Sequence, residues 1–148
     1  MEQRDLPAVA ELETICFSVP WSMELLEACL ENSLDRIWVL DIEPETGSES
    51  ESEIAAYCNF RVIAGEGELM RIAVRPELRG RGYARNLMET LVADARDSRT
   101  TAVTLEVRAS NLSAVSLYKS YGFQIEAVRR DYYTHPVEDA LIMWNREI

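Results

Sequence analysis

The chain has 148 residues, 47% of them hydrophobic, which predicts one folded globular domain spanning residues 1–148. Its formal net charge of −11 disfavours direct binding to nucleic acid and favours basic partners. We expect a cytoplasmic protein with reduced thiols. No apolar run is long enough for a membrane span, the N-terminus does not have the form of a signal peptide, and the three cysteines are widely spaced. No spacing of histidine and cysteine suggests a metal site, so no metal is expected.

The first third of the chain is predicted to contain two helices and a strand. A helix begins near Leu6, and Ser22 can cap a second helix that runs to about Glu31. Arg36–Asp41 has the β-branched and aromatic content of a strand. Residues 42–53 then break all periodicity and are rich in acids, so this acidic loop either attracts a basic substrate or is a solvated hairpin tip.

The rest of the chain alternates strands with helices, which predicts a mixed α/β sheet. A helical face from Ala84 to Ala95 follows the central strand, and a short helix over Asn111–Tyr121 is ended by Gly122. The predicted strands of this part are Ile54–Ile63, Glu68–Val74, Thr101–Val107, Phe123–Val128 and Ala140–Trp144.

The stretch Arg79–Arg85 joins the central strand to its helix and is predicted to bind phosphate or pyrophosphate. Its glycines let the backbone approach a ligand, and the helix N-terminus and the arginines supply positive charge. A P-loop is excluded because the stretch has no lysine, and a dinucleotide fingerprint is disfavoured because Arg85 occupies its third glycine position. The remaining pattern is Arg/Gln-x-x-Gly-x-Gly/Ala, and the alternative is a turn with solvated arginines.

Two residues further along suit acyl transfer to an amine, which requires a base for the amine proton and an acid for the leaving thiolate. Glu106 lies in a predicted strand and Tyr118 in the next predicted helix. Each has a simpler alternative, because Glu106 could be an outward-facing carboxylate and Tyr118 a core aromatic residue. Their spacing behind the arginine–glycine stretch favours the catalytic interpretation.

These segments together resemble a known family. The runs Glu-Val-Arg-Ala-Ser-Asn, Leu-Tyr-x-x-x-Gly-Phe, Arg-Arg-x-Tyr-Tyr and Glu-Asp-Ala-Leu-Ile-Met are similar to those of the RimI-type ribosomal-protein-alanine N-acetyltransferases, within the GNAT superfamily. The resemblance covers about residues 5 to 145. It implies the GNAT fold, with a central mixed β-sheet flanked by helices, and transfer of the acetyl group of acetyl-CoA to a protein N-terminus.

The resemblance also assigns residues. Glu106 would be the general base and Tyr118 the general acid, and the acceptor would be an alanine-starting small-subunit ribosomal protein, whose basic character suits the net charge. Residues matching the acetyl-CoA site are Ile72, Ala73, Val74, Arg79, Gly80, Arg81, Gly82, Tyr83, Ala84, Arg85 and Asn111.

Two other functions remain open, and the sequence departs from the family pattern at two places. The chain could instead acetylate lysine or a small amine, or it could be a non-catalytic acyl-CoA-binding module that regulates a partner. Only five residues precede Leu6, so the family's first strand is expected to be short or absent. The acidic loop is long for the family, which bears on the preference for an acceptor.

Overall fold

The computed structural model describes residues 1–43 and 53–148. Most of the acidic loop, residues 44–52, lies outside this range, so both interpretations of the loop stay predictions. In chain order the elements are η1 (Gln3–Asp5), α1 (Leu6–Cys16), α2 (Met23–Glu31), β1 (Asp35–Ile42), β2 (Glu53–Ile63), β3 (Glu66–Val74), η2 (Pro76–Leu78), α3 (Tyr83–Asp97), β4 (Ala102–Arg108), α4 (Leu112–Ser120), β5 (Gln124–Tyr133) and β6 (Glu138–Asn145).

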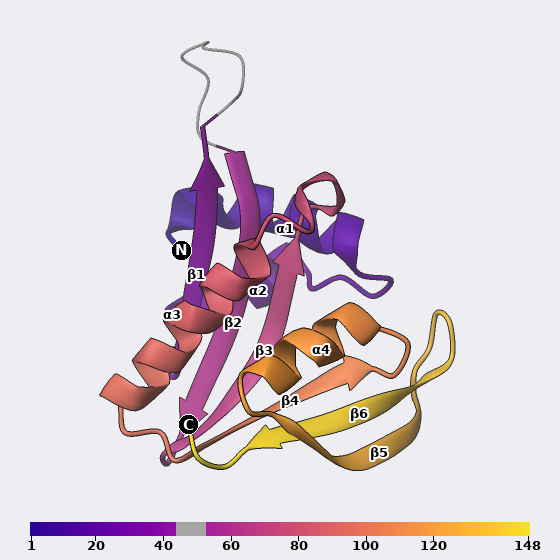
Figure 1. Ribbon diagram of the computed structural model, residues 1–148. Coiled ribbons are helices and arrows are strands. Elements are labelled where there is room, and N and C mark those ends of the chain that lie inside the picture. The colour runs from indigo at the N-terminus through magenta and orange to yellow at the C-terminus, as the bar shows by residue number, and fades with distance from the viewer. Residues whose placement is uncertain (44–52) are drawn as a thin grey trace. The chain divides into compact units, whose positions relative to one another are not determined.

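The strands form one mixed six-stranded sheet in the order β1-β2-β3-β4-β6-β5, which confirms the predicted fold class (Figure 1). β3 and β4 are parallel, with Glu68 opposite Thr104, whereas β6 is antiparallel to both β4 and β5. A parallel pair needs a crossover connection, and α3 supplies it. By its internal contacts the chain divides into two compact units, Met1–Asn59 with Arg71–Leu87, and Phe60–Met70 with Met88–Ile148.

The first unit has its core where α1 and α2 pack on β2 and the end of β3. Ser22 caps α2 as predicted, because its hydroxyl accepts a hydrogen bond from Leu25 N at 3.2 Å. Asp5 precedes α1 but does not cap it through its side chain; its carboxylate accepts a hydrogen bond from Glu2 N, and Gln3–Asp5 form η1. The buried core residues are Leu6, Val9, Leu12, Leu26, Ile54, Tyr57 and Ala73.

The second unit contains β4, β5, β6 and α4, and Figure 1 shows α4 in front of β4. Alternate residues of β4, among them Val103, Leu105 and Val107, are buried, which leaves Thr104 and Glu106 together on the other face. Gly122 follows α4 with a φ of +86°, as expected for a residue that ends a helix.

The ends of several elements differ from the sequence-based expectation. β5 runs over ten residues to Tyr133, not six to Val128, and nearly all of it is exposed. It lies at one end of the strand order, and its exposed residues include both polar side chains and Ile125, Val128 and Tyr132, so it gives no alternating signal. The turn before β3 is at Ala64–Gly65, so the strand begins at Glu66 instead of Glu68. Among the helices of the described residues, none has the length and apolar character needed to cross a membrane.

Candidate active site

The glycines of the arginine–glycine stretch adopt the backbone conformation that makes glycine necessary there. Gly80 has a φ of +78° and Gly82 a φ of +89°, and a Cβ on either would meet nothing within 4 Å. Gly82 also precedes α3, where its carbonyl accepts from Asn86 N at 3.0 Å. The first N–H groups of a helix have no partner within it, so a backbone surface with N–H donors begins at Gly82.

One arginine of this stretch contacts the end of the preceding strand. Arg79 donates from Nε to the carbonyl of Val74 at 3.2 Å, and its Nη2 lies 3.7 Å from Cys16 Sγ. Its side chain therefore lies back toward the end of β3. Arg79, Arg81 and Arg85 are all exposed, with Arg81 before the first residue of α3 and Arg85 within its first turn. Burial raises the pKa of the Cys16 thiol, with the hydrogen bond from Arg79 acting in the opposite direction, so the thiol is protonated at neutral pH.

The end of β3 carries the backbone predicted to hold the acetyl and pantetheine groups. Ile72 and Val74 are half-buried and Ala73 is buried in the core of the first unit. The strand ends where Arg75 N donates to Ala55 O at 2.9 Å, and Pro76 then begins η2. An extended acyl chain along β3, followed by a pyrophosphate at the helix start, fits this order of backbone groups.

Gly82→Val is expected to weaken acetyl-CoA binding by about tenfold or more, since a branched side chain at a φ of +89° is strained and covers the N–H groups of the α3 N-terminus. Gly65→Val is the matched control: Gly65 has a φ of +83° and equally open surroundings, but it lies in the β2–β3 turn. Titration calorimetry compares the two variants. Equal affinities in both would remove the stretch from the acetyl-CoA site.

Glu106, the predicted base, lies on β4 with two partners from β5 that the sequence analysis did not assign. Arg129 Nη2 lies 3.3 Å from the Glu106 carboxylate, and its guanidinium is 5.1 Å from the ring centre of Tyr132. The pKa of the Tyr132 hydroxyl is raised, chiefly because that hydroxyl is hydrogen-bonded to Glu106. Both partners belong to the Arg-Arg-x-Tyr-Tyr run. That run is one of the segments that resemble the family, but the sequence analysis assigned no catalytic or binding role to it.

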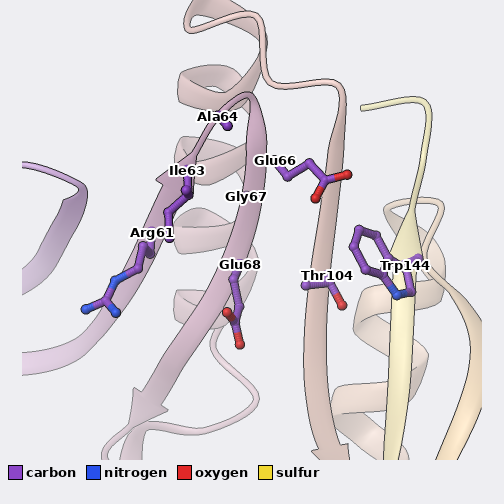
Figure 2. A pocket seen from close by; sticks show the side chains of 8 residues that line it. All are labelled: Arg61, Ile63, Ala64, Glu66, Gly67, Glu68, Thr104 and Trp144. Carbon is purple, nitrogen blue, oxygen red and sulfur yellow. The ribbon is translucent and has the colours of Figure 1, made fainter.

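A second carboxylate lies on the same face of the sheet. Glu68 is opposite Thr104, two residues before Glu106, and the two carboxylates interact. Burial, and then the charge of Glu106, raise the pKa of the Glu68 carboxyl. Glu68 and Thr104 also line a pocket of about 350 Å³ in the second unit. Figure 2 shows Glu66 on β3 extending toward β4 and Trp144, Glu68 extending along β3, and the Arg61 guanidinium directed away from them.

Tyr118 and Asn111, the other predicted site residues of the second unit, have structural contacts of their own. Tyr118 is 5% exposed, and its ring lies 6.1 Å from that of Phe123 at a tilt of 58°. Asn111 caps α4, since its side-chain oxygen accepts from Ala114 N at 3.3 Å.

The predicted acetyl-CoA residues 72–85 belong to the first unit, whereas Glu106, Asn111 and Tyr118 belong to the second. Among the described residues, no group of three or more acidic, histidine or cysteine side chains is placed to hold a metal ion.

Comparisons with known proteins identify the family. Residues 6–123 match the acetyltransferase (GNAT) family. The chain is 33% identical to the [ribosomal protein bS18]-alanine N-acetyltransferase of Escherichia coli K12, over 97% of this chain and 92% of that protein. It is 32% identical to a protein of Bacillus subtilis named putative [ribosomal protein bS18]-alanine N-acetyltransferase, over 97% and 91% of the two chains.

A crystal structure of the ribosomal-protein-S18-alanine N-acetyltransferase from Escherichia coli superposes with a TM-score of 0.84 at 32% identity, over 100% of this chain and 92% of that one. At 20% identity, Ard1 from Thermoplasma volcanium shares the fold, with a TM-score of 0.82 over 100% of this chain and 95% of that chain. The mixed sheet, the glycine turn that opens α3 and the match over most of the chain lead to one conclusion: the chain belongs to the GNAT family of acetyltransferases.

Proposed function

We propose that this chain transfers the acetyl group of acetyl-CoA to the N-terminal α-amine of an alanine-starting ribosomal protein, the small-subunit protein bS18 for which its relatives are named. The observation that carries the proposal is the similarity over 97% of the chain to relatives bearing that name. It acts as one domain in the cytoplasm, without a metal and without direct contact to nucleic acid. The face that holds Glu66, Glu68 and Glu106 is acidic, which suits a cationic acceptor.

Each residue has one task in this reaction. The backbone of Ile72–Val74 holds the acetyl and pantetheine groups, residues 79–85 bind the pyrophosphate, and Asn111 makes a further contact with acetyl-CoA. The acceptor nitrogen forms a bond to the acetyl carbon while Glu106 takes the amine proton. The carbon–sulfur bond breaks as Tyr118 gives its hydroxyl proton to the departing sulfur. Arg129 and Tyr132 orient the Glu106 carboxylate before the acceptor arrives.

The α-amine is a favourable acceptor for a carboxylate base. Its pKa is about 8, against about 10.4 for a lysine side chain, so a far larger fraction of it is neutral at pH 7. A carboxylate, directly or through one water, then needs to remove only the proton that is lost during attack. This difference favours N-terminal acetylation over the lysine alternative.

Mass spectrometry tests the proposal. The protein is incubated with acetyl-CoA and a basic peptide that starts with alanine and has an internal lysine. The expected product is about 42 Da heavier, with the acetyl group on the N-terminal fragment. Acetylation of the lysine alone would make the chain a lysine acetyltransferase. Binding of acetyl-CoA without transfer to any amine would support the regulatory module instead.

A further inference from the structure

Glu13 of α1 is a charged residue in the core of the first unit. It is 0% exposed. Its carboxylate accepts hydrogen bonds from the Tyr57 hydroxyl, from Trp21 N at 2.7 Å, and from Arg71 Nε and Nη2 at 3.2 and 3.0 Å. A buried carboxylate is tolerated only with such partners. Two of them, Trp21 and Arg71, link α1 to the start of α2 and to β3.

Arg71 extends this network to the α1–α2 segment, defined here as residues Phe17–Trp21. The guanidinium carbon lies 3.9 Å from the ring centre of Phe17 and 4.9 Å from that of Trp21, so the cation contacts both aromatic rings. Arg71 Nη2 also donates to the carbonyl of Val19 at 2.9 Å. One side chain of β3 therefore contacts the beginning, the middle and the end of the α1–α2 segment.

Residues that contact or adjoin the segment connect it to the predicted acetyl-binding backbone. Arg71 directly precedes Ile72, and just before the segment Cys16 Sγ donates to the carbonyl of Val74 at 3.4 Å. Within the segment, Val19 is 59% exposed and the neighbouring Pro20 is also exposed. This exposed apolar surface therefore belongs to the segment that Arg71, the residue before the predicted acetyl-binding backbone Ile72–Val74, contacts.

We propose that Arg71 is a positioning residue for the acceptor: through Glu13, Phe17, Val19 and Trp21 it holds the α1–α2 segment in the place where the acceptor's first residue lies against β3. This inference rests on the proposed function, since it assigns the acceptor side of the same site. A link that merely stabilised the core would affect unfolding without affecting the KM for the acceptor.

The test uses the double variant Glu13→Gln/Arg71→Met. Arg71→Met alone would leave a buried carboxylate without its cation, whereas Gln is neutral: its oxygen can accept from Trp21 N, and its amide N–H can donate to the Tyr57 hydroxyl oxygen. The acceptor-peptide KM is expected to rise about tenfold or more, with acetyl-CoA affinity by calorimetry unchanged. Hydrogen exchange of the amides of Phe17, Ser18, Val19 and Trp21 is expected to become at least about tenfold faster.

Arg75→Met is the matched control. Arg75 is also a buried arginine of the first unit, and it forms salt bridges with Glu11 at 3.4 Å and Glu53 at 3.1 Å. Its loss is expected to lower the unfolding temperature but to leave the acceptor KM and the exchange of residues 17–21 unchanged. An unchanged KM or unchanged exchange in the double variant overturns the positioning role. Failure of the proposed function is distinguished from this, because the wild-type protein would then leave the alanine peptide unmodified.

Discussion

Glu106→Gln is expected to lower kcat/KM for an alanine-starting peptide by about 10²- to 10⁴-fold near neutral pH, the range for loss of a general base. Glutamine keeps the shape of the side chain, can still accept a hydrogen bond from the Tyr132 hydroxyl and still lies beside Arg129. The local structure is therefore expected to be retained. It cannot take a proton from the amine. The loss is therefore expected in the reaction and not in acetyl-CoA binding.

The pH dependence identifies the cause of that loss. At low pH the acceptor amine is mostly protonated and depends on the base, whereas above about pH 8 it is neutral without help. The ratio of wild-type to variant kcat/KM should therefore be largest at low pH and shrink as the pH rises past about 8. Initial rates measured across this range at saturating acetyl-CoA give the ratio. A ratio that is independent of pH would make Glu106 a positioning group.

Glu68→Gln is the control that the structure adds, because Glu68 is a second carboxyl on the same face and its pKa is raised. If Glu106 is the base, Glu68→Gln should change mainly the KM for the cationic acceptor, and its effect should weaken as salt screens the charge. If Glu68→Gln shows the larger loss of kcat, with the strong pH dependence, the base is Glu68 and not Glu106.

The local elements of this fold could be predicted because each carries its signal within a few residues. The capping serine before α2, the buried alternation of β4 and the glycine after α4 are all found where the sequence places them. The same is true of the glycines before α3, whose positive φ values explain why no other residue suits the turn. The wrong boundaries are at the start of β3, which is Glu66, and at the end of β5, where Arg129, Arg130 and Asp131 occupy an exposed strand at the end of the sheet order.

The contacts that surround the candidate site could not be predicted, because they join residues far apart in the sequence. In the sequence, Glu13 is only one position of an amphipathic helix. Its hydrogen-bond partners Tyr57 and Arg71 are 44 and 58 residues away along the chain. Glu106 and Glu68 share a face only through the register of β3 with β4. A pattern of local spacing identifies which residues can do chemistry; the pairing of strands decides which of them meet.

Tyr118→Phe is expected to lower kcat by about 10²-fold, the low end for removal of a general acid, with acetyl-CoA binding nearly intact. Phenylalanine keeps the ring that is buried beside Phe123, so a loss from disturbed packing would appear as a lower unfolding temperature, which is not expected. High pH should not rescue the variant, because the missing step is protonation of the departing thiolate. A thiol with a pKa of about 8.5 leaves fairly well unaided, so the loss should be smaller than that of Glu106→Gln at low pH. The pH–rate profile and thermal unfolding of the variant are measured together, and full activity with an unchanged profile would leave Tyr118 as a packing residue of α4.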